Sequence, residues 1–155
     1  MSSPTALPAS GHPLRLHGTC VDLGGVAVLL RGPPGAGKSD LALRLIDGGA
    51  HLVADDQVEL QLERGRLVPR APAAILGLIE ARGIGLLPVP ARSGATLGLV
   101  VDLATDDIER MPEPSVVELL GVRVPVVRLN PFEASAVAKL RLSAGAIARG
   151  ELPAA

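Results

Sequence analysis

Aromatic residues are almost absent from this chain of 155 residues, which has one Phe and neither Trp nor Tyr. Proteins that bind single-stranded nucleic acid stack bases on aromatic side chains, so this absence argues against that class of protein. The net charge of −1 provides no basic excess for binding nucleic acid or an anionic membrane. Because aromatic residues are scarce, the base of any bound nucleotide is expected to be held loosely, with a relaxed choice between ATP and GTP.

Cysteine and long apolar runs are also scarce. The single Cys20 cannot form a disulfide within the chain, which fits a reducing, cytoplasmic location. The apolar run 26–30 is far too short to span a bilayer, and the N-terminus does not resemble a secretory signal. Because 48% of the residues are hydrophobic, the chain can still bury a core of Leu, Val, Ile and Ala.

The pattern of apolar residues and glycines predicts one α/β domain over residues 13–150, between a flexible arm at 1–12 and a loose tail at 151–155. The segment 73–89 is expected to be a strand or helix ending at Glu80, followed by a glycine-bracketed loop. The remaining predicted elements are strands at 14–23, 26–31, 51–54 and 95–104, hairpins at 57–72 (at the sheet edge) and 115–129, and helices at 39–47 and 133–149.

A phosphate-binding loop is predicted between the strand at 26–31 and the helix at 39–47. The stretch matches the pattern G-x-x-x-x-G-K-[ST], and a preceding strand with a following helix is the context in which this pattern binds phosphate. Backbone N–H groups of the loop and of the helix start would face the anion. Lys38 is expected at the β- and γ-phosphates and Ser39 on Mg²⁺. The predicted nucleotide-binding residues are Gly32, Pro33, Pro34, Gly35, Ala36, Gly37, Lys38 and Ser39.

Two adjacent carboxylates, Asp55 and Asp56, follow the strand at 51–54. We expect this strand to run parallel to the loop strand and beside it, so that both end at the same sheet edge. One carboxylate would hold Mg²⁺ and the other would accept the proton of an attacking hydroxyl, which indicates transfer to an alcohol. The sequence does not decide which of Asp55 and Asp56 takes which role. Asp56 is favoured as the base and Asp55 as the metal ligand, and the alternative is a pair of ordinary aspartates ending a strand.

A second group lies in the stretch "IEARGIG" at 79–85. Glu80 is a candidate second Mg²⁺ ligand, and Arg82 could stabilise the charge of a phosphoryl group in transfer. Taken alone the stretch is weak evidence, because Glu and Arg in a loop are more often solvated surface charges. His17, beside an apolar strand, is likewise more often a packing or surface residue than a catalytic one.

With these residues in place, the chain resembles the catalytic domain of the HPr kinase/phosphorylase family, bacterial enzymes that act on a serine of the phosphocarrier protein HPr. The resemblance covers about residues 16–144. It rests on "HGTCVDLGGVAVLLRGPPGAGKSDLALRLIDGGAHLVADDQVEL", on "IEARGIGLLPV" and more loosely on "VELLGVRVPVVRL". It implies a phosphoenolpyruvate-carboxykinase-like fold, in which a P-loop lies on a mixed β-sheet with flanking helices.

The resemblance also implies site residues, cofactors and partners. The cofactors would be ATP and Mg²⁺, and the partner would be HPr or a homologue. His17, Lys38 and Asp56 would be catalytic, with Ser39 and Glu80 near the metal. A homo-oligomer is expected, a hexamer in full-length relatives, although the C-terminal helices that dock subunits look shortened here.

Several positions depart from the long form of the family. We expect the usual N-terminal domain to be absent, as in the short form found in alphaproteobacteria. Pro34 stands where the long form usually has Ser, Val117 where it has Arg, and "RLN" at 128–130 where it has "GRN". Because these elements accompany the phosphorylase direction, kinase activity is favoured over phosphorolysis.

The leading hypothesis is therefore an ATP- and Mg²⁺-dependent protein-serine kinase acting on HPr or a related carrier. Two alternatives stay open. A small-molecule P-loop kinase would use the same loop with a different acceptor. A nucleotide-sensing module with little catalysis would bind ATP without turnover, and Val117 in place of Arg weakly favours this alternative.

Overall fold

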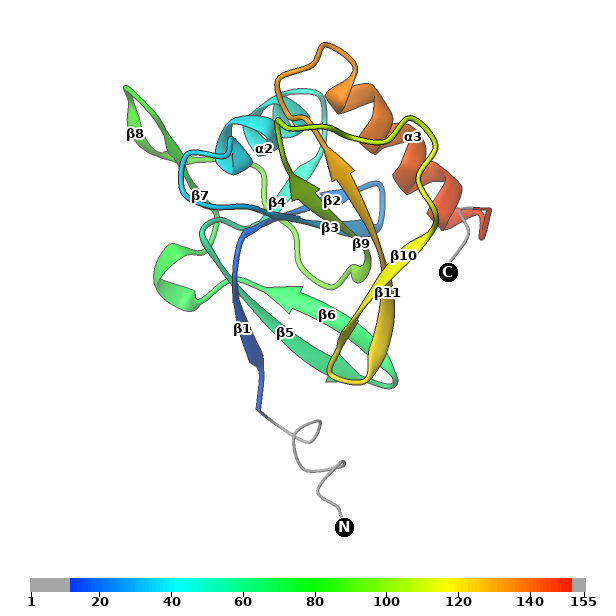
Figure 1. Cartoon of the computed structure of the whole chain (residues 1–155). Helices are drawn as coiled ribbons and strands as arrows, with labels where there is room; N and C mark the ends of the chain where they lie inside the picture. The colour runs from blue at the N-terminus through cyan, green and yellow to red at the C-terminus, as the bar shows by residue number, and fades with distance from the viewer. Residues whose placement is uncertain (1–11, 152–155) are drawn as a thin grey trace.

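Three layers of secondary structure make up residues 12–151, the part of the chain that the computed structural model describes (Figure 1). Two helices cover one face of a central sheet, and a smaller sheet covers the other face. The predicted arm and tail lie outside the described residues except for His12 and Glu151. No helix among the described residues is long and apolar enough to cross a membrane.

The central sheet is mixed, as expected. Its strands, in spatial order, are β10 (Ser115–Leu119), β11 (Val122–Leu129), β9 (Thr96–Leu103), β3 (Val26–Arg31), β2 (Thr19–Leu23) and β4 (His51–Ala54). The pairs β11–β9 and β9–β3 are parallel, and the other three pairs are antiparallel. The predicted α/β fold with a mixed sheet is therefore confirmed.

The position of β4 corrects one prediction. β4 runs in the same direction as β3, but it is not its neighbour, because β2 lies between them and is antiparallel to both. The physical reason is the tight turn at Gly24 and Gly25, both with positive φ, which folds β2 directly onto β3. The side of β3 that β4 would have needed is then already occupied.

The predicted strand at 14–23 is in fact two strands in two sheets. β1 (Leu14–His17) pairs with β5 (Gln57–Glu63), which pairs with β6 (Arg66–Arg70). The break falls at Gly18, where a Cβ would lie 2.7 Å from the Leu30 carbonyl oxygen. The hairpin β5–β6 therefore belongs to a separate three-stranded sheet, not to the edge of the main sheet.

The segment after β6 also differs from expectation. A 3₁₀ turn, η1 (Ala73–Ile75), leads into β7 (Leu78–Ala81), which pairs with β8 (Gly85–Pro88) in a two-stranded hairpin. The predicted glycine-bracketed loop is thus only the turn of this hairpin, which extends from the body of the molecule (Figure 1). Gly83 and Gly85 have φ values of 88° and 115°, which allow the chain to reverse there.

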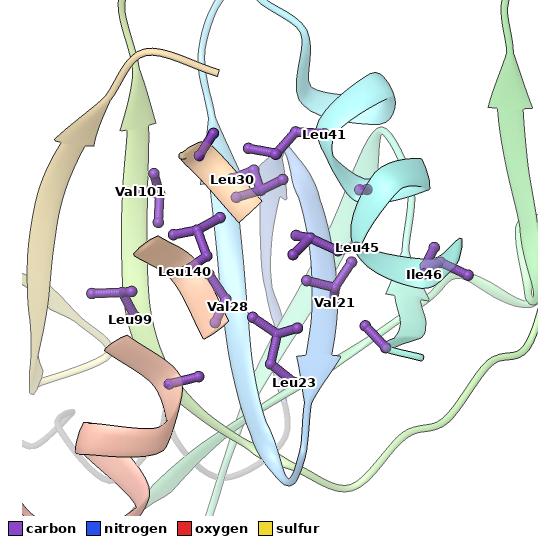
Figure 2. Close-up of a cluster of buried hydrophobic side chains, with 14 of the residues drawn as sticks. Val21, Leu23, Val28, Leu30, Leu41, Leu45, Ile46, Leu99, Val101 and Leu140 are labelled. Atoms are coloured by element: carbon purple, nitrogen blue, oxygen red, sulfur yellow. The ribbon is translucent and has the colours of Figure 1, made fainter. Parts of the chain in front are cut away.

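Two helices pack on one face of the central sheet. α2 (Lys38–Asp47) starts one residue before the prediction, and α3 (Ala136–Ala148) is shorter than the predicted 133–149. Figure 2 shows Leu41 and Leu45 of α2 and Leu140 of α3 packed among side chains of the sheet. Burying a Leu side chain stabilises the fold by about 1.5–3 kcal/mol, so this core holds α2 firmly behind the loop that precedes it.

The side chains of successive β3 residues point alternately to the two faces of the central sheet. Val28 and Leu30 point into the core under the helices, whereas Ala27 and Leu29 belong to a second core. The second core lies between the central sheet and the three-stranded sheet, where Val58, Leu60 and Leu67 are buried. Because β3 is anchored on both faces, the phosphate loop begins from a rigid strand.

Candidate functional site

The phosphate loop spans residues 32–37, between the end of β3 and the start of α2. Gly37 has a φ of 98°, a conformation that glycine adopts readily, and no side chain caps the helix that follows. The first N–H groups of α2 are therefore free to bind an anion. Within the loop, the Ala36 N–H donates to the Pro33 carbonyl over 3.0 Å.

An ion pair at the base of the loop ties β3 to β9. Arg31, the last residue of β3, donates from Nε and Nη2 to the two carboxylate oxygens of Asp102, over 2.8 and 3.1 Å. Such two-pronged pairs orient both partners. The strand end from which the loop departs is thus held in place on the β9 side.

Lys38 folds over the loop. Its Nζ donates to the carbonyl oxygens of Gly32 at 2.7 Å and Pro33 at 3.0 Å. The ammonium group therefore lies at the loop itself, where the sequence predicts contact with phosphate oxygens.

Asp55 is buried directly after β4 and accepts three hydrogen bonds. Its Oδ1 accepts from the hydroxyls of Ser39 at 2.7 Å and Thr19 at 2.9 Å, and its Oδ2 accepts from the Glu80 N–H at 2.9 Å. The residue is only 6% exposed. These bonds join β2, α2 and β7 through one carboxylate.

Sequence reasoning missed Thr19. Its hydroxyl is fully buried and donates to Asp55 because β2 lies between β3 and β4. Nothing in "TCVDL" distinguishes this threonine from any other strand residue, so only knowledge of the strand order could have found it.

Asp56 faces the other way. It has a positive φ of 71°, and its side chain is 68% exposed. The His17 Nδ1 lies 3.6 Å from the Asp56 Oδ1, and the Gly18 N–H donates to the Asp56 carbonyl at 3.1 Å. Aspartate tolerates this left-handed conformation better than most residues, and it turns the two adjacent carboxylates apart.

A pocket of about 660 Å³ collects most of the predicted site residues. Of those residues, Pro33, Ala36 and Asp55 do not line it, and Asp55 lies behind Ser39 through their hydrogen bond. The lining residues are His17, Thr19, Gly32, Pro34, Gly35, Gly37, Lys38, Ser39, Asp56, Glu80, Ala81, Arg82, Gly83 and Gly85. The phosphate loop, the exposed carboxylate and the β7–β8 hairpin therefore share one cavity.

The oxygen donors beside the loop suit Mg²⁺, an ion that takes most of its ligands from water and phosphate. They do not form a metal site built from protein side chains alone. Among residues 12–151, no three His, Cys, Asp or Glu side chains gather as a metal site. Mg²⁺ usually keeps several waters and binds substrate phosphates with only one or two protein ligands. The Ser39 hydroxyl and the Asp55 carboxylate, in direct contact, form such a sparse oxygen set.

Cys20 takes no part in the pocket. It is a free thiol, fully buried in β2. Burial raises the pKa of this thiol well above its ordinary value, and the nearby charge of Asp22 raises it further. The group therefore stays protonated, and a thiolate nucleophile is not available from it.

Known proteins resemble the chain over most of its length. Residues 11–140 match the family model described as the HPr serine kinase C-terminal domain. An HPr kinase/phosphorylase of Variovorax paradoxus is 40% identical over 123 residues, which cover 70% of this chain and 39% of that protein. One from Clostridium tetani is 43% identical over 91 residues, covering 59% of this chain and 29% of that protein. The chain thus spans well under half the length of these curated relatives.

A solved structure shares the fold. The Hpr(Ser) kinase/phosphatase from Coxiella burnetii superposes with a TM-score of 0.71 at 27% sequence identity, covering 88% of this chain and 89% of that one.

Proposed function

This chain belongs to the HPr serine kinase C-terminal domain family, and on that premise we propose that it transfers the γ-phosphoryl group of ATP to a serine of HPr or a related carrier protein, with Mg²⁺, in the cytoplasm. The proposal rests mainly on one observation. Lys38, Ser39 and Asp56 line the same pocket, so a bound triphosphate and a candidate base share one cavity.

The proposed nucleotide site is the loop from Gly32 to Ser39. The loop N–H groups and Lys38 hold the phosphates, and the lysine exchanges its contacts with the loop carbonyls for contacts with phosphate oxygens. Ser39 and Asp55 would hold Mg²⁺, with Glu80 as a further oxygen donor on the β7–β8 hairpin. Bound there, the metal ion would offset the negative charge of the phosphates.

The proposed base is Asp56. Its exposed carboxylate accepts the proton of the serine hydroxyl as the serine oxygen bonds to the γ-phosphorus and the bond from that phosphorus to ADP breaks. His17 lies 3.6 Å away and helps to orient this carboxylate. Arg82, on the same pocket wall, contacts the phosphoryl group in transfer.

A protein acceptor fits the surroundings better than a small molecule. The side chains of His17 and Asp56 are 78% and 68% exposed, so the acceptor side of the pocket is open. Next to it, the β7–β8 hairpin exposes the apolar side chains of Ile84 and Leu86. An open site beside exposed apolar residues suits a docked protein surface.

The decisive assay is transfer of radiolabelled γ-phosphate from ATP to a purified HPr-like carrier. We expect label on a serine of the carrier and none when Asp56→Asn replaces the wild-type protein. ATP consumption with metabolites but not carriers would favour the small-molecule kinase. Binding of ATP without any turnover would favour the sensing module.

Replacing Lys38 tests the phosphate loop directly. Lys38→Ala is expected to weaken ATP binding by about 1.5–3 kcal/mol, because a charged contact to phosphate is lost. Titration calorimetry measures this change. The matched control is Lys139→Ala on α3, which removes the only other lysine and is expected to leave ATP affinity unchanged. Equal affinities of wild type and Lys38→Ala would refute the loop assignment.

The direction of transfer and self-association belong to the same proposal. The kinase direction is expected to dominate, so phosphorylated carrier incubated with inorganic phosphate should keep its label. The chain is expected to self-associate, which sedimentation velocity measures.

A further inference from the structure

The only aromatic side chain of the chain lies exposed beside the phosphate loop. Phe132 is 61% exposed, although burial would stabilise an apolar ring. Its ring edge lies against Gly37, since a Cβ on that glycine would be 3.3 Å from the Phe132 Cζ. Core packing therefore does not explain the position of the ring.

The segment that carries Phe132 is held in place. The Phe132 N–H donates to the Asn130 Oδ1 at 2.9 Å, which shapes the turn after β11. From α2, Arg44 Nη2 donates to the Pro131 carbonyl at 2.6 Å. The first contact orders the turn itself and the second attaches it to α2, so the ring keeps a defined place at the loop.

The strand order puts Phe132 on the flank of the loop opposite the acids. β4, which leads to Asp55, lies two strands from β3 in one direction, and β11, which leads to Phe132, lies two strands away in the other. A nucleotide with its terminal phosphate beside Ser39 and Asp55 can extend away from them along the sheet edge, toward the strands on the other side of β3. Its base then reaches the β11 flank.

We propose that Phe132 stacks on the base of the nucleotide bound at the phosphate loop and is a binding determinant of this site. The inference rests on the proposed nucleotide site. Base–aromatic stacking strengthens binding by roughly 5- to 150-fold in other proteins and is tolerant of the base, because every base has a π-face. The base is therefore held more firmly than the scarcity of aromatics predicts, while the choice between ATP and GTP stays relaxed.

The test compares two ligands that differ in having a base. Titration calorimetry of the full chain with Mg²⁺ measures the affinity for ATP and for inorganic tripolyphosphate. Phe132→Leu, which keeps an apolar side chain without the π-face, is expected to weaken ATP binding roughly tenfold and to leave tripolyphosphate binding unchanged. Leu142→Ala is the matched control, because it truncates another exposed apolar residue, on α3, and should change neither affinity.

A spectroscopic variant reports contact with the base independently. Because the chain contains no Trp, Phe132→Trp introduces a single emitter, and its fluorescence should be quenched by ATP but not by tripolyphosphate. Leu142→Trp should respond to neither ligand.

Three results would overturn the inference. If Phe132→Leu binds ATP as tightly as wild type, stacking is refuted while the proposed nucleotide site stands. If Phe132→Leu lowers the affinities for ATP and for tripolyphosphate equally, the ring only supports the loop and does not contact the base. If wild type binds neither ligand, the proposed function fails and the inference fails with it.

Discussion

Two groups of side chains meet at the adjacent residues Asp55 and Asp56. The first is the cluster of Thr19, Ser39 and Asp55, in which Thr19 and Asp55 are buried, and the second is the exposed pair of His17 and Asp56. In the first, one carboxylate accepts three hydrogen bonds from three different elements. In the second, a single 3.6 Å contact joins two side chains that are mostly in water. The positive φ of Asp56 produces this contrast by turning the chain between the two aspartates.

The contrast shows how one Asp-Asp pair can serve two purposes. A buried carboxylate that accepts three hydrogen bonds has a fixed geometry, which suits the support of Ser39 at the phosphate loop. An exposed carboxylate has few partners and is free to meet an incoming hydroxyl. Substitutions on the two sides should therefore differ in whether they reduce stability or activity.

The largest expected effect is the loss of activity in Asp56→Asn. Removing a general base lowers the rate of phosphoryl transfer by about 10²- to 10⁴-fold. Unfolding free energy should change by less than about 0.5 kcal/mol, because asparagine also tolerates the left-handed conformation. Single-turnover transfer and urea unfolding measure the two quantities. A large loss of stability would show that Asp56 supports the fold and is not mainly a catalytic residue.

Asp55→Ala should have the next largest effect, on stability. It leaves the Thr19 and Ser39 hydroxyls and the Glu80 N–H without their acceptor, which costs roughly 3 kcal/mol of unfolding free energy. Asp55→Asn should cost less, since the hydroxyls can rotate to accept from its amide while its oxygen still receives the Glu80 N–H. Urea unfolding of both variants checks this order, and equal stability of Asp55→Ala and wild type would remove the contrast.

A smaller effect is expected for Thr19→Val, which changes the shape of the side chain little. The loss of one hydrogen bond to a buried carboxylate should lower the unfolding free energy by about 1–2 kcal/mol. If Thr19 also orients Asp55 toward the metal, ATP binding should need a higher Mg²⁺ concentration in the variant. Denaturation and a magnesium titration of ATP binding separate the two roles, and no change in either would leave Thr19 without a role.

The smallest effect concerns Cys20, next to Thr19 on the buried side. Because burial raises the pKa of this thiol in the folded protein, its contribution to stability is complete below the unfolded pKa of about 8.5 and is lost as pH rises above it. Between pH 8.0 and 9.5, wild type should lose about 1 kcal/mol more unfolding free energy than Cys20→Ala. Urea unfolding at the two pH values measures this, and parallel behaviour of the two proteins would mean that the thiol is not shielded. The absence of Tyr leaves few other groups to titrate there.

Contiguous motifs were the easiest features to predict. The phosphate loop and α2 depend on neighbours within a few residues, and they appear where expected, with α2 starting one residue early. The common edge of the loop and the aspartates was also predicted, although the reason given for it was partly wrong. β4 has the expected direction, but β2 separates it from β3.

The missed features involve residues that are distant in sequence. The break of the first strand at Gly18 depends on how closely β2 passes Leu30, which no local pattern records. The bond from Thr19 to Asp55 spans 36 positions and exists only because of the strand order. Phe132 had no visible role in the sequence because its place beside Gly37 depends on where β11 ends.

By itself, the sequence determined that a phosphate loop joins a strand to a helix and that two acids follow, because glycine spacing and apolar periodicity act over short stretches of backbone. Only the tertiary structure decided that Asp55 is buried against Thr19 while Asp56 remains open beside His17, and that the lone Phe lies at the loop. Burial and strand order depend on contacts between distant segments, and these form only when the whole core packs.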